Sequence, residues 1–372
     1  MVRRPRSEWF PGHFRVKGGA KGHSEAVFPW ELRPSHVLGW ARGRRRTLPA
    51  LLLAVVVLLA GPGCVPVGAG AGGGDGKPRD GAPPGPFGAY VGHGSEGVRR
   101  LSELDRWLGP ATPRVGHAYL PGDRWFNIEG GTNDLEHWAK WRKARADRLF
   151  VLNVPMLERS EAHLPDSFVR RELRTGADGA YDAHFRKLAR RLVSLGVPDT
   201  VLVIGWEMNG ITYQHRCGPD PDAWKAYWVR IVTAMRSVGG QRFRFEFAPN
   251  RGRDAIPWPK CYPGDRYVDV IGMDAYDQPN SMSFAEQRDE PYGLTEHVRF
   301  ARRHGKPIAY PEWGLFRNGD NPAYIRGMLT WYARHRPLYQ TISDYCPHGV
   351  WWCSGNPRSS TEYRRLMTGP FD

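Results

Sequence analysis

The stretch Val201–Gly210, Val-Leu-Val-Ile-Gly-Trp-Glu-Met-Asn-Gly, most strongly constrains how this chain can fold. Its first four residues form a short apolar run, which is typical of a strand that is buried on both faces. The run ends in Trp-Glu. A second segment, Pro307–Gly314, has the same construction, because its apolar run ends in Glu-Trp. Two buried strands are therefore expected to end in a carboxylate beside an indole.

These two carboxylates, Glu207 and Glu312, indicate a functional site. A carboxylate at the end of a buried strand is costly unless it is paired or used in chemistry. Paired carboxylates cleave glycosidic bonds, and an indole offers a sugar an apolar surface with a polar edge. A content of 15 Trp fits such a surface. We therefore expect a site that acts on a sugar ring; for either Glu alone, a structural ion pair is the alternative.

Eight strand-like segments alternate with helix-like ones along the body of the chain. Asp220-Pro221 and Asn321-Pro322 each place a capping residue before a proline at the first helical position. The predicted strands are Gly88–Gly92, Val115–Leu120, Leu149–Pro155, Val201–Gly205, Phe243–Pro249, Val268–Met273, Pro307–Tyr310 and Leu338–Ile342. This alternation predicts an α/β fold, a (β/α)8 TIM barrel, with a doubly wound open sheet as the alternative. In a barrel, Glu207 and Glu312 would end strands four and seven and face one site.

Carboxylates on strands four and seven are the hallmark of clan A of the glycoside hydrolases. The chain resembles glycoside hydrolase family 26, the β-mannanase family, in its actinobacterial branch. The resemblance runs from about Gly88 to Leu366 and is carried by Gly179–Asp182, Gly205–Gly210, Tyr262–Asp265, Val268–Asp277 and Gly305–Gly314. It implies a mannan endo-1,4-β-mannosidase-like enzyme in which Glu207 is the acid/base and Glu312 the nucleophile. It also implies that Tyr276 hydrogen-bonds the nucleophile.

The chain departs from the family pattern at three places. The family often has Arg four residues before the acid/base and His immediately before it, where this chain has Val203 and Trp206. Characterised mannanases carry Trp at the end of strand eight, where this chain has Asp344-Tyr345-Cys346. The cleavage machinery is therefore better supported by the sequence than the mannan substrate.

Further residues are expected to bind the substrate. We expect Trp206, Trp313 and Trp351 to contact sugar rings, because their indoles follow or flank the predicted strand ends. Asn209 and Asn250 can bind sugar hydroxyls, or cap loops through backbone contacts. Asp274 and Asp277 are expected to hold loops through backbone amides. No metal or organic cofactor is expected.

The first 85 residues differ in composition from the body. Residues 1–47 are basic and are expected to be a disordered leader or the product of a mis-assigned start. Residues 48–71 contain a run of 13 mostly apolar residues after Arg42–Arg46, which predicts a signal-peptide core and cleavage region. An uncleaved anchor is the alternative. Residues 72–85 form a Gly/Pro linker, and the catalytic domain is expected at 86–372. The protein is expected to be secreted, or anchored to a membrane through this segment.

The charge distribution argues against nucleic-acid binding. The net charge is +15, but residues 1–80 hold 13 Lys and Arg against only 5 Asp and Glu, so over half of the excess lies in the leader. The body has no basic patch interleaved with aromatics and no glycine-rich nucleotide fingerprint. The expected partner is a polysaccharide or oligosaccharide substrate, and the protein is expected to be a monomer.

Four cysteines of the body are expected to form disulfides in an exported protein. Cys217 follows strand four and Cys261 follows strand five, and loops of adjacent barrel strands lie side by side. Cys346 and Cys353 flank one short loop after strand eight. The sequence therefore predicts the pairs Cys217–Cys261 and Cys346–Cys353.

Two functional hypotheses follow from these observations. The first is a secreted retaining endo-β-glycosidase that acts by double displacement on a β-glycan, with β-mannan as the leading substrate. β-1,3-Xylan, β-glucan and transglycosylation are variants of it. The second is a carbohydrate-binding barrel that has lost turnover, to which Val203 lends weight. The presence of both Glu207 and Glu312 favours the enzyme.

Overall fold

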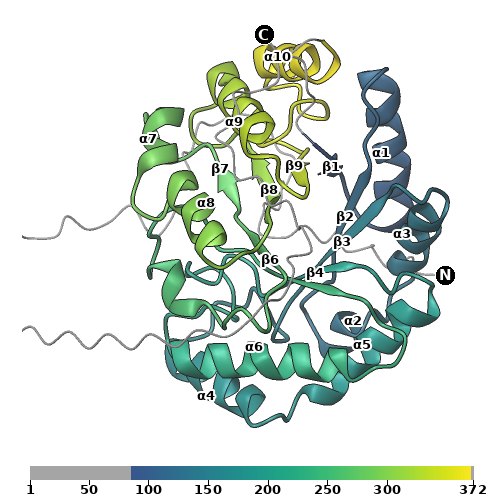
Figure 1. Ribbon diagram of the computed structural model, residues 1–372, viewed down its shortest axis with the longest axis vertical. Helices are drawn as coiled ribbons and strands as arrows, with labels where there is room; N and C mark the ends of the chain where they lie inside the picture. Colours follow the sequence, from purple (N-terminus) through teal and green to yellow (C-terminus); the bar gives the residue numbers. More distant parts are fainter. Residues whose placement is uncertain (1–84, 370–372) are drawn as a thin grey trace, which may run out of the picture. The chain divides into compact units, whose positions relative to one another are not determined.

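The computed structural model describes residues 85–369, which form a barrel of parallel strands surrounded by helices (Figure 1). The predicted leader and signal segments, 1–47 and 48–71, and all but the last residue of the linker lie outside the described residues. The strands are β1 Phe87–Tyr90, β2 Val115–Tyr119, β3 Leu149–Val154, β4 Val201–Ile204, β5 Arg244–Phe247, β6 Val270–Gly272, β7 Ala275–Tyr276, β8 Ile308–Gly314 and β9 Gln340–Ser343. The helices are α1 Gly94–Leu108, α2 Trp125–Ile128, α3 Asp134–Lys143, α4 Asp166–Ala177, α5 Asp182–Ser194, α6 Pro221–Arg236, α7 Phe284–Asp289, α8 Leu294–Arg303, α9 Pro322–His335 and α10 Pro357–Thr368, and a 3₁₀ helix covers Trp258–Cys261.

Eight of these strands close into the predicted barrel. β1 to β6 pair in chain order, β1 also pairs with β9, β9 with β8, and β8 with β6, all in parallel. The (β/α)8 barrel is therefore confirmed, and the open doubly wound sheet is excluded. All eight predicted strands are present. β7 is an additional two-residue strand that extends the β6 segment and pairs with β8.

The apolar strand runs supply two layers of core because neighbouring side chains point to opposite faces. Val201 and Val203 face the barrel interior, where Val151, Val270 and Ala309 also lie. Leu202 and Ile204 face the surrounding helices and join the larger outer core, together with Trp224 and Trp228 of α6. This double burial explains why the strands are apolar without alternation.

The predicted helix starts are confirmed by their caps. The Asp220 side chain accepts a hydrogen bond from the Ala223 amide at 3.1 Å before α6, and the Asn321 side chain accepts one from the Tyr324 amide at 3.3 Å before α9. In both helices proline takes the first position, where its missing N–H costs nothing. Within residues 85–369, no helix combines the length and the apolar character that crossing a bilayer requires.

The two predicted disulfides are confirmed. Cys217 and Cys261 are bonded and join the loop after β4 to the 3₁₀ helix that follows β5. Cys346 and Cys353 are bonded across the short loop after β9. Both bonds therefore stabilise loops at the C-terminal ends of the strands, which is the end where barrel enzymes place their active sites.

The two disulfides are expected to contribute unequally to stability. In the loop-entropy model, the bond between Cys217 and Cys261, 44 residues apart, stabilises by about 4 kcal/mol. The bond between Cys346 and Cys353, 7 residues apart, stabilises by about 2 kcal/mol. Urea unfolding of the two double Cys→Ser variants should show this order, and an equal loss in both variants would contradict it.

Candidate active site

Three carboxylates gather at the C-terminal end of the barrel. Glu207 follows β4, Asp274 lies between β6 and β7, and Glu312 lies on β8. One oxygen of each lies within 4.8 Å of the others. Glu312 and Asp274 are buried, whereas Glu207 is partly exposed. The sequence therefore correctly predicted that Glu207 and Glu312 share one site, but it did not place Asp274 there.

A β-bulge turns Glu312 into the barrel. On β8 and β9, Tyr310 pairs with Gln340 and Trp313 pairs with Ile342. Between these two pairs β8 therefore contains one residue more than β9. Tyr310 faces outward, where it packs on Tyr332 of α9. Strict alternation would send Glu312 outward as well, and the extra residue reverses this. The sequence placed the strand end at Tyr310; the strand instead continues through Glu312 to Gly314, with this irregularity in it.

Positive backbone φ angles position Glu207. Gly205 has φ of +56°, and a Cβ there would lie 2.4 Å from the Met156 sulfur, so only glycine fits. Glu207 itself has φ of +52°, although it is not glycine. This conformation costs about 1–2 kcal/mol for such a residue and is concentrated at functional sites. The Glu207 amide donates to the Ala248 carbonyl at 2.8 Å, which ties this turn to β5.

Glu312 is surrounded by hydrogen-bond donors. The Tyr276 hydroxyl donates to Oε2 at 2.8 Å, and the Asn153 amide nitrogen donates to Oε1 at 3.2 Å. A further hydrogen bond comes from the Tyr119 side chain. Burial raises the pKa of Glu312, and these three donors oppose the rise because they stabilise the ionised form. The arrangement favours a carboxylate at Glu312.

Glu207 has a different environment. Burial raises the pKa of Glu207 well above its usual value, and the negative charges of Glu312 and Asp254 raise it further. Only a hydrogen bond with the Asn250 side chain opposes this rise. The two glutamates therefore differ in the number of donors, and the arrangement holds the proton on Glu207 in preference to Glu312.

Asp274 is the most poorly compensated of the three. It is 1% exposed, and a backbone hydrogen bond from Glu312 is the one contact that favours its ionised form. Burial raises the pKa of Asp274 well above its usual value, and the charges of Glu312, Glu207 and Glu246 add to the rise. The sequence predicted only a loop-holding role through backbone amides for Asp274, and the structure places it among the carboxylates of the site as well. Asp277 does hold loops, but it accepts from the side chains of Gln287, Asn318 and Asn321 rather than from the predicted backbone amides.

A series of buried polar side chains, linked by hydrogen bonds, leads to Glu312 from the barrel interior. The His117 Nε2 lies 2.9 Å from the Asn153 Oδ1, and its Nδ1 lies 3.1 Å from the Thr341 hydroxyl. Burial lowers the pKa of His117 to about 4, so the ring is neutral. Because Asn153 Oδ1 can only accept, Nε2 carries the proton, and the amide nitrogen of Asn153 is turned toward Glu312. Sequence reasoning missed Asn153; its one signal is an amide inside an otherwise apolar strand.

Three of the predicted substrate-binding residues lie at the carboxylates. Tyr276 contacts Glu312, and its hydroxyl also lies 2.7 Å from the Ser343 hydroxyl. Asn250 contacts Glu207. Trp206 is 3% exposed and packs against Tyr119, with 5.5 Å between ring centroids. Trp206 therefore forms part of the apolar wall of the site.

Trp313 does not face the site as predicted, and for Asn209 the structure supports the loop-capping alternative over sugar binding. Asn209 is fully buried, and its side chain accepts from the Asn250 amide at 2.8 Å and donates to the Asn250 carbonyl at 3.1 Å. Both ends of its amide therefore hold the loop that carries Asn250. Trp313 is also fully buried and faces the helices, where it packs against Tyr332 and donates to Gln340 at 2.6 Å. The bulge that turns Glu312 inward turns Trp313 outward.

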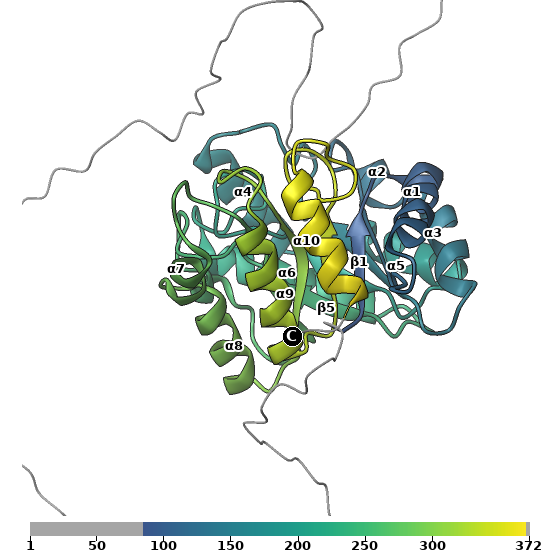
Figure 2. The ribbon, with the colours of Figure 1, turned by 90° about the horizontal axis from the view of Figure 1, so that it is seen from above.

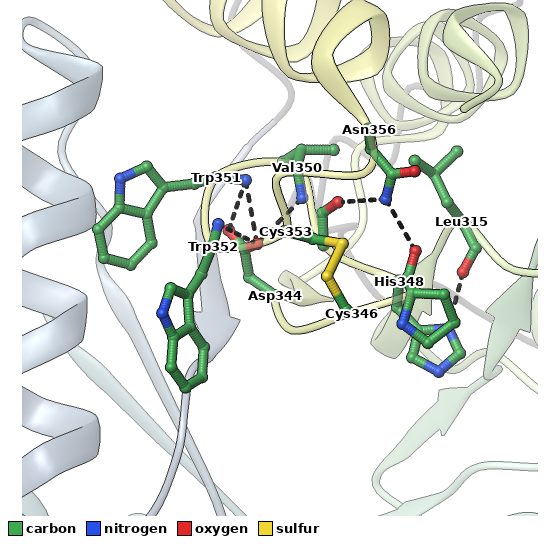
Figure 3. The surroundings of a disulfide bond; sticks show 11 residues. Leu315, Asp344, Cys346, His348, Val350, Trp351, Trp352, Cys353 and Asn356 are labelled. Atoms are coloured by element: carbon green, nitrogen blue, oxygen red, sulfur yellow. Dashed lines mark hydrogen bonds between the residues drawn. A yellow bond between two sulfur atoms is a disulfide. The ribbon is translucent and has the colours of Figure 1, made fainter. Parts of the chain in front are cut away.

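Trp351 lies on the disulfide-closed loop after β9. The buried Asp344 carboxylate accepts from the backbone amides of Val350, Trp351 and Trp352, as Figure 3 shows. Trp351 is half-buried against the core, whereas Trp352 is 40% exposed and is covered by the Arg100 guanidinium at 3.4 Å. Both side chains point away from the disulfide, toward the blue α1 side of the molecule (Figure 3). None of the contacts of Trp351 described here joins it to Glu207 or Glu312, so its substrate role stays a prediction.

The donor set suits proton chemistry better than metal binding. Three carboxylates at this spacing can in principle ligate a divalent cation. The oxygens of Glu312, however, already accept from hydroxyl and amide hydrogens, which are directed where a cation would lie. One protonated and one ionised carboxyl group is the pairing that glycosidases require. The barrel and its site therefore define the class of a glycoside hydrolase.

Comparisons with known proteins agree with this class. Residues 204–301 match the model of Glycosyl hydrolase family 26, so this segment is similar to that family, as the sequence predicted. The matched segment contains Glu207, Asp274 and Tyr276 but not Glu312. No curated protein matches the chain. The segment match and the barrel together identify the chain as a glycoside hydrolase similar to family 26.

Solved structures share the fold. A GH26 β-mannanase from Bacteroides ovatus is 18% identical, with a TM-score of 0.57 over 78% of this chain and 90% of its own. The catalytic domain of the GH26 endo-β-1,4-mannanase from Bacillus sp. JAMB-750 is 16% identical, with a TM-score of 0.57 over 77% and 87%. The Bacillus subtilis mannanase man26 is 14% identical, with a TM-score of 0.53 over 75% and 83%.

The variant Asp274→Asn tests how much stability the three neighbouring carboxylates cost the folded protein. Because the folded-state pKa of Asp274 is raised, its contribution to stability is full below the unfolded pKa and is lost as pH rises toward the folded pKa. The amide keeps the shape without the charge, so the variant should gain more than about 1 kcal/mol at pH 8 and much less at pH 4. Urea unfolding at both pH values measures this.

Asp277→Asn is the matched control, because its carboxylate already has three donors. This variant should lose stability at pH 8. An Asp274→Asn variant that is destabilised as much as Asp277→Asn would show that the Asp274 charge is compensated.

Proposed function

We propose that the protein is a secreted retaining endo-β-glycosidase, with β-mannan as its leading substrate. The observation that carries the proposal is the unequal environment of two carboxylates that lie within 4.8 Å of each other. This spacing leaves no room for a water molecule between Glu312 and the sugar, so it supports direct attack by Glu312. An inverting enzyme needs a wider gap.

In the proposed mechanism Glu207 acts first as an acid. Its proton passes to the glycosidic oxygen while a Glu312 oxygen bonds the anomeric carbon, so the leaving sugar departs neutral. The glycosyl ester removes the negative charge of Glu312, which is the second cause of the raised pKa of Glu207. The pKa of Glu207 then falls, and Glu207 becomes a base that takes a proton from water. The water oxygen bonds the anomeric carbon as the bond from that carbon to Glu312 breaks, which restores the Glu312 carboxylate.

β-Mannan is proposed from the family resemblance and from the solved mannanases that share the fold. This chain differs from characterised mannanases at the end of β9. They carry Trp there, whereas this chain has Asp344 followed by Tyr345. The negative charges of Glu312 and Glu207 contribute, after burial, to the raised pKa of Tyr345, so this side chain lies near the reacting groups. We therefore propose Tyr345 as the aromatic surface for the sugar, and other β-glycans belong in any substrate test.

Export is proposed from the basic and apolar N-terminal segment and is supported by the two disulfides, which are typical of oxidising compartments. A single polypeptide that acts as a monomer on an external polysaccharide fits both features. Mass spectrometry of the N-terminus of the protein recovered from culture medium tests this proposal. Retention of residues 48–71 on cells would favour the anchor.

The function is tested on a panel of β-mannan, β-glucan, β-1,3-xylan and β-1,4-xylan. The wild-type protein should release oligosaccharides from β-mannan, and Glu312→Ala should release none until a small anion such as azide fills the vacated space. Glu207→Ala should lose on the order of 10²–10⁴-fold with poor leaving groups but little with aryl leaving groups that need no proton. Glu362→Gln on α10 is the control for removal of a remote carboxylate.

A wild-type protein that binds the panel without cleaving any member would favour the non-catalytic barrel. Equal losses for good and poor leaving groups in Glu207→Ala would remove Glu207 from the acid role. Cleavage of a glycan other than mannan would leave the mechanism intact and change only the substrate.

The donors to Glu312 generate a pH prediction. Tyr276→Phe removes one donor, and because that donor favours the ionised form, the pKa of Glu312 should rise. A hydrogen bond to a charged group is worth about 1.5–3 kcal/mol, so the acid limb of the kcat/KM profile should move up by about 1–2 pH units. Tyr363→Phe, which removes a buried hydroxyl without a partner among the described residues, should leave the profile unchanged.

A further inference from the structure

Arg251 is a buried charge that the proposed mechanism does not use. It follows Asn250 in the loop after β5, and its side chain is only 5% exposed. A guanidinium group that leaves water is costly unless charged and polar partners surround it. Burial lowers the pKa of Arg251 from its usual value, although arginine keeps its charge in proteins. The contacts of Arg251 therefore indicate which part of the molecule depends on it.

The backbone of Arg251 extends the sheet beyond the end of β5. The Asp274 amide donates to the Pro249 carbonyl at 2.9 Å, and the Arg251 amide donates to the Asp274 carbonyl at 2.9 Å. These two hydrogen bonds form a parallel bridge in which Asn250 pairs with Asp274. Asn250, which contacts Glu207, is thereby fixed against the segment that leads into β7.

The Arg251 side chain continues this pairing where the neighbouring strand has ended. Within residues 85–369, β7 pairs only with β8, so its other edge has no strand neighbour. In an extended strand, every second carbonyl points to the same edge. Arg251 Nη2 donates to the Tyr276 carbonyl at 3.2 Å and also to the Gln278 carbonyl. Together with its backbone contact to Asp274, Arg251 therefore binds three alternate carbonyls of the segment that carries Tyr276.

The other terminal nitrogen of Arg251 binds the segment between α7 and α8. Nη1 donates to the Gln287 carbonyl at 3.4 Å and forms a salt bridge with Glu290. Gln287 lies in the last turn of α7, where carbonyls have no partner within the helix. α7 and α8 lie next to each other on one side of the barrel in both views (Figures 1 and 2). Arg251 therefore joins this outer part of the molecule to β7.

The partners of the Arg251 side chain require a guanidinium group. Two carbonyls of β7 and its extension, one carbonyl of α7 and one carboxylate are bound by a single side chain. The planar guanidinium offers five N–H donors in a fixed fork, whereas the lysine ammonium is a point charge with three donors on a flexible stem. A lysine at this position would keep the charge but could not keep all of these contacts.

We propose that Arg251 is a positioning residue that holds the Tyr276 hydroxyl against Glu312. That hydroxyl donates to Glu312 Oε2 at 2.8 Å, and the Tyr276 backbone is held by β8 on one edge and by Arg251 on the other. Release of one edge loosens the donor, which disfavours the ionised form of Glu312. The kinetic consequence rests on the proposed function, in which Glu312 is the nucleophile.

A purely structural role for Arg251 makes a different prediction. A buried arginine that satisfies carbonyls and a carboxylate stabilises the fold wherever it lies, and its loss lowers the free energy of unfolding. That role leaves the ionisation of Glu312 unchanged in variants that still fold. The two explanations therefore differ in the pH dependence of catalysis rather than in stability.

The test uses Arg251→Lys, Tyr276→Phe and their double variant. Arg251→Lys should move the acid limb of the kcat/KM profile to higher pH by about 1 pH unit, in the same direction as Tyr276→Phe. The double variant should show little more shift than Tyr276→Phe alone, because the hydroxyl that Arg251 positions is already absent. The control is Arg142→Lys on α3, where Arg142 pairs with Asp199 at 2.6 Å just before β4, at the other end of the barrel. This control should leave the acid limb in place.

Two further measurements cover loss of folding and loss of turnover. Arg251→Met/Glu290→Met removes the buried ion pair as a unit, a change that proteins often tolerate, and should move the acid limb in the same direction. Carbon-13 NMR titration of the Glu312 carboxyl group, assigned by its absence in Glu312→Gln, measures the same shift without any cleavage.

An unchanged acid limb and an unchanged Glu312 titration in the folded Arg251 variants would overturn the proposal. So would a shift that adds in full to that of Tyr276→Phe, because Arg251 would then act by another route. A wild-type protein that cleaves no glycan would contradict the proposed function instead, and the NMR titration would still decide whether Arg251 positions Tyr276.

Discussion

The site depends on three carboxylates, two buried and one partly exposed, that lie together at one end of a parallel barrel. Glu207, Asp274 and Glu312 lie within 4.8 Å, and burial raises the pKa of each of them. They differ in the donors that face them, because three side chains donate to Glu312 whereas one contacts Glu207. Both residues are glutamates, so this difference in donors favours the ionised form at Glu312 and the protonated form at Glu207. The same crowding costs stability, which the outer core and the two disulfides offset.

Backbone irregularity produces the geometry that regular strands cannot. An unbroken alternation along β8 would place Glu312 among the helices and Trp313 in the barrel, and the bulge reverses both. At β4 the positive φ angles of Gly205 and Glu207 turn the chain over the end of the barrel. Each feature is local, and each lies at the point where a strand passes from core to site. The positive φ of Glu207 is a strained conformation that is concentrated at functional sites and that fold stability alone does not explain.

The sequence predicted the barrel well because its strands are apolar runs and its helices carry explicit caps, such as Asp220 and Asn321. It also predicted both glutamates, because a charge at the end of an apolar run is conspicuous. It failed at Trp313 and did not place Asp274 among the carboxylates for one reason: the direction of a side chain depends on bulges and turns that leave no periodic signal. Asn153 was missed because its neighbours look like ordinary core. The hydrogen bonds that Glu312 receives could therefore be found only in the structure.

The central claim is that Glu312 is the nucleophile and that Glu207 carries the proton. The most direct measurement is mass spectrometry of the peptide that carries the label after incubation with a 2-deoxy-2-fluoro-β-mannosyl fluoride, or with the corresponding sugar of the preferred glycan. The fluorine slows hydrolysis of the glycosyl ester, so the intermediate accumulates. The account predicts one sugar bound to Glu312 in the peptide that contains Pro307–Gly314. A label on Glu207 or Asp274, or release of an inverted product without any label, would contradict it.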